Sequence, residues 1–216
     1  MENCEVLLEL LLEAAKNSKS DSACKESSSN IPIGISNRHI HLSQKDLESL
    51  FGKDYKLTKL KDLSQPGQYA CKEVVTICGS KGAIEKVRIL GPVRSKTQVE
   101  VLAGDCRKLG VVSHVRLSGD LIHSAPITLI GQKGSVQLEE GLIVAQRHIH
   151  MTPENAKCLG VHDGELVSIE VEGLRGGVYK NIAIRANDTS NLECHIDIEE
   201  ANAMGLDSRS KVKLVK

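Results

Sequence analysis

The sequence predicts a mainly β fold of the barrel or sandwich type, organised as two related subdomains. Short β-branched segments alternate between apolar and polar residues and are separated by glycine, proline and aspartate, which is typical of many short strands joined by turns. One motif, Arg-His-Ile-His followed by an apolar and a hydroxyl residue, occurs at 38–43 and again at 147–152. The repetition indicates two copies of one supersecondary unit, which would place equivalent histidines around a shared centre.

The first thirty residues are predicted to lie outside this folded body. Within residues 2–16, leucine, valine and alanine recur at helical spacing while the glutamates fall on other faces, which predicts a short amphipathic helix. Residues 17–30 are rich in serine and have few apolar side chains, a composition typical of a flexible linker. We therefore expect the folded body to begin near Ile31.

The elements of the body follow from the local pattern. Strands are predicted at residues 73–77, 83–90, 98–101, 135–138, 166–171, 181–185 and 211–215. Short helices are predicted after Ser43 and after Thr152, because a hydroxyl at these positions can cap a helix and Pro153 suits its first turn. A third helix is expected at residues 198–204, ending at Gly205.

Composition excludes several classes of function. Lys plus Arg and Asp plus Glu both number 28, so the formal net charge is zero, and the chain has only four aromatic residues other than histidine. A nucleic-acid partner is not expected, because such binding depends on positive charge and aromatic stacking. No apolar run is long enough to span a membrane. The seven cysteines are dispersed and form no Cys-x-x-Cys pair, which argues against a disulfide framework or a cysteine-based zinc site.

The duplicated histidines are the strongest chemical signal. Residues two apart in a strand share a face, so His39 should project with His41, and His148 with His150. Neutral imidazole is a common zinc ligand, and a catalytic zinc needs a few such nitrogens and one open position. A single pair would fit exposed strand residues better, but the duplicate keeps the arginine, the isoleucine and the cap, which favours a shared metal centre. His195, just before a predicted helix, could complete one of two sites.

A second informative stretch contains Arg94 and Glu100. The Gly-Pro at 91–92 forces a turn that presents Arg94 at the end of a strand, and a guanidinium there suits bidentate recognition of phosphate. The simpler alternative is a solvated arginine. Glu100, on the following strand, is either a carboxylate ligand or an ordinary outward-facing residue.

In combination, these motifs resemble the PduL-type phosphate propanoyltransferases of bacterial microcompartments. The resemblance rests on Ser-Asn-Arg-His-Ile-His-Leu-Ser at 36–43, Ile-Leu-Gly-Pro-Val-Arg at 89–94, Gln-Val-Glu at 98–100, Arg-His-Ile-His-Met-Thr-Pro at 147–153 and Cys-His at 194–195. It covers the chain from about Ile31 to the C-terminus. It implies an enzyme that interconverts an acyl-CoA plus phosphate with an acyl phosphate plus CoA.

The resemblance also implies a more specific fold than the local pattern does. Members of the family have two β-barrels capped by short helices. Residues 31–37 and 146–216 would form the first barrel and residues 38–145 the second, with residues 1–30 as a separate helix and linker.

Site residues can be transferred position by position from the family. Those that resemble zinc ligands are His39, His41 and Glu100 for one ion, and His148, His150 and His195 for a second. Arg94 resembles the catalytic, phosphate-binding arginine. Positions that resemble contacts to coenzyme A are Ile35, Ser36, Asn37, Lys81, Arg88 and Asn202.

The resemblance finally implies partners and a location. The N-terminal helix would be an encapsulation peptide that binds shell or cargo proteins and places a homo-oligomeric enzyme in a microcompartment lumen; otherwise the enzyme would be cytoplasmic. The pathway stays open among propanediol, ethanolamine, fucose and choline degradation. The alternatives are that the helix packs on its own barrel or drives self-association. Propanoyl-CoA is the expected substrate and acetyl-CoA a close rival, because one methylene discriminates by only about 1–3 kcal/mol. Two other functions remain open: a metal-dependent hydrolase of acyl esters or phosphates, and a non-catalytic assembly protein with structural zinc.

Overall fold

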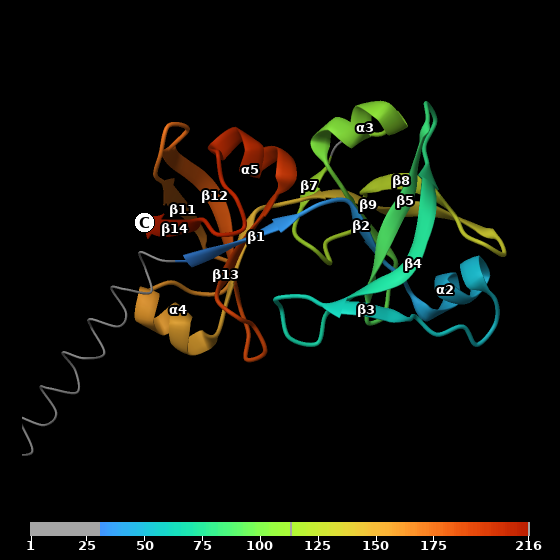
Figure 1. The fold of residues 1–216 in the computed structure, drawn as a ribbon, viewed down its shortest axis with the longest axis horizontal. Helices are drawn as coiled ribbons and strands as arrows, with labels where there is room; N and C mark the ends of the chain where they lie inside the picture. The colour runs from blue at the N-terminus through green and yellow to red at the C-terminus, as the bar shows by residue number, and fades with distance from the viewer. Residues whose placement is uncertain (1–30, 113, 216) are drawn as a thin grey trace, which may run out of the picture. The chain divides into compact units, whose positions relative to one another are not determined.

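The structure, a computed structural model, describes residues 31–215 except residue 113. The helix and linker expected at residues 1–30 lie outside the described residues. Within the described part the chain is mainly β, and its four helices have seven or eight residues each (Figure 1). In this part of the chain, no helix has the length and apolar character that crossing a bilayer requires.

Six strands close into a first barrel that joins the two ends of the described chain. Their order is β1 (Ile31–Ser36), β13 (Glu193–Asp197), β10 (His148–Met151), β12 (Gly177–Ala186), β11 (Leu166–Val171) and β14 (Lys211–Val215). The barrel closes through antiparallel pairing of β1 with β14, where Ile31 lies opposite Val212. Both side chains are buried, so this closing pair also contributes to the core.

The intervening chain forms a second barrel. Its strands are β2 (His39–His41), β3 (Lys59–Asp62), β4 (Tyr69–Cys78), β5 (Ala83–Gly91), β6 (Gln98–Val101), β7 (Val115–Arg116), β8 (Ala125–Ile130) and β9 (Ser135–Ala145). Pairing runs in a closed circuit of six, β4-β5-β2-β6-β9-β8 and back to β4, while β3 and β7 extend the sheet. The predicted mainly β fold with two barrels is therefore confirmed.

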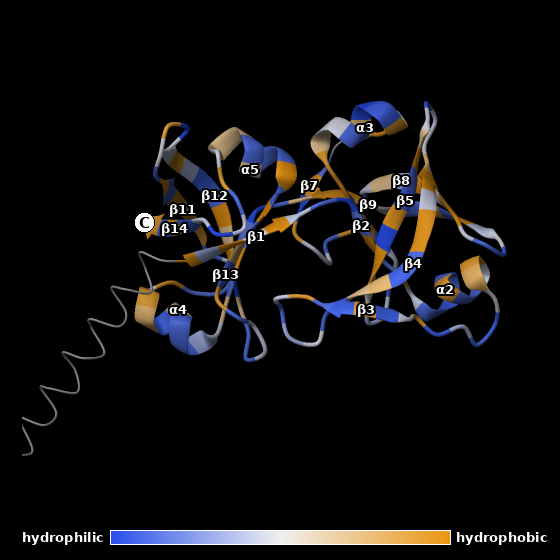
Figure 2. Cartoon of the chain, in the orientation of Figure 1, coloured by the Kyte–Doolittle hydropathy of each residue, from blue (hydrophilic) through white to orange (hydrophobic). Residues whose placement is uncertain are grey.

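Period-two alternation fills the interior of the second barrel. Val75 and Ile77 on β4 and Val87 and Ile89 on β5 are buried, while the residues between them are more exposed. Figure 2 shows this alternation as bands of differing hydropathy along both strands. Because few aromatic residues are available, aliphatic side chains supply most of this core.

Three of the four described helices begin where the sequence predicts, and the third of them also ends there. Ser43 caps α2 (Gln44–Phe51) by accepting a hydrogen bond from the backbone of Asp46, and Thr152 caps α4 (Pro153–Leu159) in the same way. Helix α5 (Ile198–Met204) is followed by Gly205 at φ 70°, the left-handed conformation that favours glycine.

Helix α3 (Ala103–Leu109) was not predicted. The residue at its N-cap position is Leu102, whose side chain cannot accept a hydrogen bond. The Asp105 carboxylate instead accepts from the backbone N–H of Leu102, so the helix begins without the residue type by which helix starts are recognised.

The chain divides into two compact units. One contains residues 31–33, His148–Cys194 and residues 204–215, and the other contains Gly34–Arg147 and His195–Ala203. Strands β1 and β13 thus each pass from one unit into the other.

Candidate metal centres

The first cluster lies on strands β2 and β6 of the second barrel. These strands pair in antiparallel register, with His39 opposite Glu100 and His41 opposite Gln98. One ligand atom each from His39, His41 and Glu100 lies within 4.8 Å of the other two. His39 Nε2 is 3.4 Å from Glu100 Oε2. Local strand pairing therefore produces the two-histidine, one-carboxylate set that the family resemblance implies.

The donor geometry of His39 fits a metal ion. Its Nδ1 is 2.8 Å from the carbonyl oxygen of Asn37, so a proton on Nδ1 is donated there and the lone pair of Nε2 is directed at Glu100. Burial lowers the pKa of His39, but the charge of Glu100 and the hydrogen bonds to Glu100 and Asn37 outweigh it and raise the pKa overall. The Nε2 atom can therefore carry a proton that it donates to Glu100, or, once the ring is neutral, a lone pair that would bind a metal ion lying between the ring and the carboxylate.

His41 fits the same ion for a different reason. Burial, followed by the charges of His39 and Arg94, lowers its pKa to about 3, so the imidazole is neutral near pH 7, the form that binds metals. Its Nδ1 is buried and has no hydrogen-bond partner among the described residues. Because a buried polar atom without a partner is costly, a cation at this position would remove an unfavourable feature.

The second cluster lies on β10 and β13, which are neighbours in the first barrel. Ligand nitrogens of His148, His150 and His195 all lie within 4.8 Å of one another. His148 Nε2 and His150 Nε2 are 3.1 Å apart, close to the separation of roughly 3.3 Å expected for two nitrogens on one tetrahedral zinc. The two rings meet at 85°, as the rings of His39 and His41 meet at 87°. Both clusters thus have the donor types that zinc prefers.

The internal repeat extends further than the Arg-His-Ile-His motif. In each copy the arginine pairs with a carboxylate on the helix that follows the strand of the third ligand. Arg38 donates to Asp105 of α3 from Nε at 2.7 Å and from Nη2 at 3.0 Å. Arg147 donates from Nη1 to Glu200 of α5 at 2.9 Å. Asp105 follows Glu100 by five residues and Glu200 follows His195 by five, so the repeated unit comprises two strands, each followed by a short helix.

Arg94 lies directly after β5, near the end of β2. Its backbone N–H donates to the carbonyl oxygen of Leu42 at 2.8 Å, and Arg94 forms an isolated parallel bridge with Ser43. Its guanidinium Nη1 donates to the Ser118 hydroxyl at 3.0 Å. The turn expected at residues 91–92 therefore returns the arginine to the strand that carries His41.

Sequence reasoning did not select Gln98 and Ser118, which connect Arg94 with Glu100. A signal for Gln98 existed, since it precedes Glu100 by two residues and so shares its strand face. Ser118 follows β7, a strand of two residues, and nothing in its local sequence marks it.

The residues expected to contact coenzyme A are not all close together along the fold. Ile35 and Ser36 end β1, Asn37 leads into β2, and Arg88 on β5 lies opposite His39 in parallel register. Asn37 and Arg88 thus adjoin the first cluster, and the Ser36 hydroxyl donates to the carbonyl oxygen of Ile196, beside His195 of the second. Lys81 is exposed in the turn before β5, seven residues or roughly 23 Å of extended strand from Arg88. Asn202 is exposed on α5.

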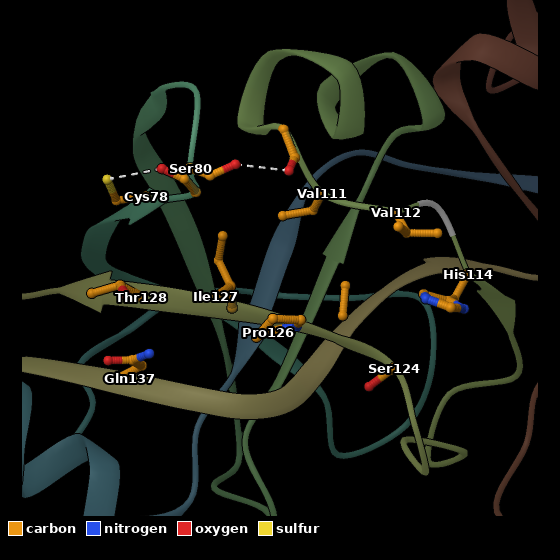
Figure 3. A pocket seen from close by; sticks show the side chains of 13 residues that line it. Cys78, Ser80, Val111, Val112, His114, Ser124, Pro126, Ile127, Thr128 and Gln137 are labelled. Carbon is orange, nitrogen blue, oxygen red and sulfur yellow. Dashed lines mark hydrogen bonds between the residues drawn. The ribbon is translucent and has the colours of Figure 1, made fainter.

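A separate cavity of about 520 Å³ opens beside β8 (Figure 3). Its lining combines the end of β4, the segment after α3 and parts of β8 and β9, with apolar residues such as Val111 and Ile127 beside Ser80 and His114. None of the six expected metal ligands lines it. The cavity is therefore distinct from both clusters.

Comparison with known proteins finds a family and many relatives. The family model described as phosphate propanoyltransferase matches residues 32–207. A phosphate propanoyltransferase of Rhodobacter capsulatus is 48% identical over 211 residues, which cover 98% of this chain and 95% of the relative. That of Thermotoga maritima is 50% identical over 187 residues (86% and 89%). That of Lachnoclostridium phytofermentans is 53% identical over 174 residues (80% and 81%).

Proposed function

Since the chain belongs to the phosphate propanoyltransferase family and is thus an acyltransferase that uses phosphate, we propose that it interconverts propanoyl-CoA plus phosphate with propanoyl phosphate plus CoA. The match over residues 32–207 and the identity of about half of all positions support this reaction. A phosphate oxygen forms a bond to the thioester carbonyl carbon, the carbon–sulfur bond breaks, and the sulfur leaves as the CoA thiolate. Acetyl-CoA, one methylene shorter, is the nearest competing substrate.

We further propose that each chain binds two zinc ions. His39, His41 and Glu100 would hold one, and His148, His150 and His195 the other. The observation that carries this proposal is the first cluster, where a neutral buried His41 lies beside His39, whose Nε2 atom is directed at the Glu100 carboxylate. When bound, zinc with an open position supplies affinity for sulfur and lowers the pKa of a thiol.

The chain's own residues have separable roles in this reaction. Arg94 would hold the phosphate through its guanidinium fork, and its hydrogen bond to Ser118 fixes the direction of that fork. Ile35, Ser36, Asn37 and Arg88 would contact the CoA beside His39. CoA is an extended ligand, and we propose that it also contacts Lys81 and Asn202.

The N-terminal helix expected at residues 2–16 keeps its proposed role as an encapsulation peptide. It would bind microcompartment shell or cargo proteins and carry a homo-oligomeric enzyme into the lumen. The helix contributes none of the proposed site residues, so this role is independent of the chemistry.

One assay tests the reaction against its alternatives. Free thiol release from propanoyl-CoA should require phosphate, and propanoyl phosphate plus CoA should regenerate the thioester. Thiol release without phosphate would instead indicate a metal-dependent hydrolase. No thiol release from any short acyl-CoA, by protein that contains its metal, would indicate an assembly protein with structural zinc.

A further inference from the structure

A continuous line of buried and partly buried hydrogen bonds connects Arg94 with Glu100. Gln98 lies on β6, is 1% exposed and points to the same side as Glu100. Its Nε2 donates to Glu100 Oε1 at 2.6 Å and to the Ser118 hydroxyl at 2.8 Å. The same hydroxyl accepts from Arg94 Nη1 at 3.0 Å.

The partners of Gln98 fix the orientation of its amide. Its Oε1 accepts from the backbone N–H of Gly119 at 2.8 Å, a group that can only donate. Its Nε2 faces the Glu100 carboxylate, which can only accept when ionised. The oxygen and nitrogen of the amide therefore cannot exchange places. A fully bonded, buried amide of this kind is rigid, because every alternative leaves a polar group without a partner.

The rigid Gln98 amide restricts the orientation of the Glu100 carboxylate directly and that of the Arg94 guanidinium through Ser118. Glu100 Oε1 is engaged by Gln98, which leaves Oε2 directed at His39 Nε2. At the other end, Ser118 sets the direction of the Arg94 guanidinium. One Nε2–H group of Gln98 is donated to the Glu100 carboxylate and the other to the Ser118 hydroxyl, so Gln98 is linked directly to Glu100 and, through Ser118, to Arg94.

We propose that Gln98 and Ser118 are positioning residues that couple the phosphate-binding arginine to the carboxylate ligand of the first metal site. The proposal rests on the function proposed above. Gln98 orients Glu100 for the metal and supports Ser118. Ser118 contacts Arg94 and Gln98 but not Glu100, and without Ser118 the Gln98 amide is still held by Glu100 and by the backbone N–H of Gly119. Loss of Gln98 should consequently affect both metal and phosphate binding, and loss of Ser118 only phosphate binding.

The test compares Gln98→Met and Ser118→Ala in the metal-loaded full chain. Met has nearly the volume of Gln but cannot donate. Gln98→Met should lower the affinity for one of the two zinc ions by roughly 10–100-fold, measured by competition with a chromophoric chelator. Loss of a hydrogen bond to a metal ligand typically lowers metal affinity by this factor. It should also raise the KM for phosphate by about tenfold. Ser118→Ala should raise the phosphate KM by a similar factor while both zinc affinities and the acyl-CoA KM stay unchanged.

Controls separate this role from a structural one. Gln98→Glu keeps the shape and the bond from Gly119 but loses both donors, so it should show the same two defects if Gln98→Met does not fold. Gln137→Met, at an exposed position on β9, should leave all three parameters unchanged. A folded Gln98 variant with normal zinc affinities and normal phosphate KM would overturn the proposal. The zinc competition needs no substrate. It therefore still tests whether Gln98 orients the metal ligand if the wild-type chain shows no phosphate-dependent thiol release.

Discussion

Two histidines of one motif have opposite acid–base properties in this protein. The pKa of His39 is raised and that of His41 is lowered to about 3, although only Ile40 separates them. The sequence places both on one strand face by periodicity alone. It cannot show that the Asn37 carbonyl accepts from one ring while the other ring is buried without a partner for Nδ1 among the described residues. Those differences depend on the backbone path and on packing from distant strands.

At the scale of single residues, Arg94 offers the clearest test of the phosphate role. Arg94→Ala should raise the phosphate KM at least tenfold and much more than the acyl-CoA KM, because only phosphate loses its bidentate partner. Arg94→Lys should also be impaired, since an ammonium cannot reproduce the fork. Steady-state kinetics with each substrate varied in turn measure both effects.

The neighbouring cation provides a matched control for Arg94. Lys96 lies two residues further on, its side chain is 69% exposed, and its Nζ is 3.7 Å from Glu140. Lys96→Ala should leave the phosphate KM unchanged. Equal rises in both KM values for the Arg94 variants would contradict a specific role in phosphate binding.

At the scale of elements, prediction succeeded where the decisive contacts are local. Helices α2 and α4 begin at hydroxyl caps whose partners lie three residues away. Helix α3 was not predicted because its first turn is stabilised through the Leu102 backbone and through Arg38, which lies in the bend before β2. The part of the repeat that contains the third ligand and the following helix was not predicted for the same reason, because its Arg–carboxylate pairs join residues 67 and 53 positions apart.

The Arg38–Asp105 pair should act as a clamp that holds β2 to α3. The carboxylate is 10% exposed and accepts two hydrogen bonds from the guanidinium. Asp105→Asn or Arg38→Gln should destabilise the fold by about 1.5–3 kcal/mol, because one charged partner loses its hydrogen bonds. Arg38→Lys should recover only part of this loss, as it restores the charge without the fork. Denaturant unfolding measures the free energies.

The exposed Lys59–Asp62 pair serves as the reference for this clamp. Its side chains are 52% and 73% exposed, so Lys59→Gln should change the free energy of unfolding by less than about 1 kcal/mol. If Asp105→Asn had no larger effect than Lys59→Gln, the ion pair would not hold β2 to α3.

At the scale of the whole molecule, strand content was predictable but strand partners were not. Alternation identifies β4, β5 and β14 as strands from their own residues. Barrel closure depends instead on pairings such as β1 with β14 and β4 with β8, which bring together segments far apart in the sequence. Family resemblance supplied the two barrels, because the local pattern alone was equally compatible with a sandwich.

The described fold sets the point at which the N-terminus can be removed. In the described part of the chain the first barrel begins with Ile31 opposite Val212, so a chain lacking residues 1–30 retains every described strand of both barrels. That truncated chain should keep its phosphate-dependent activity. Removing residues 1–36 should abolish folding and activity, because it deletes β1 and leaves β13 and β14 without a strand between them.

The proposed targeting role of residues 1–30 predicts that this segment is sufficient to carry a reporter protein into microcompartments. A fluorescent reporter fused to residues 1–20 should gather in compartments when it is produced in a compartment-forming host, because the expected helix presents an apolar stripe suited to a partner groove. Replacing the leucines at positions 7 and 11 by glutamate should make the reporter diffuse. A diffuse reporter with the natural segment, together with equal activity and solubility of the full and truncated enzymes, would remove the support for encapsulation. Aggregated reporter without compartments would indicate that the stripe drives self-association instead.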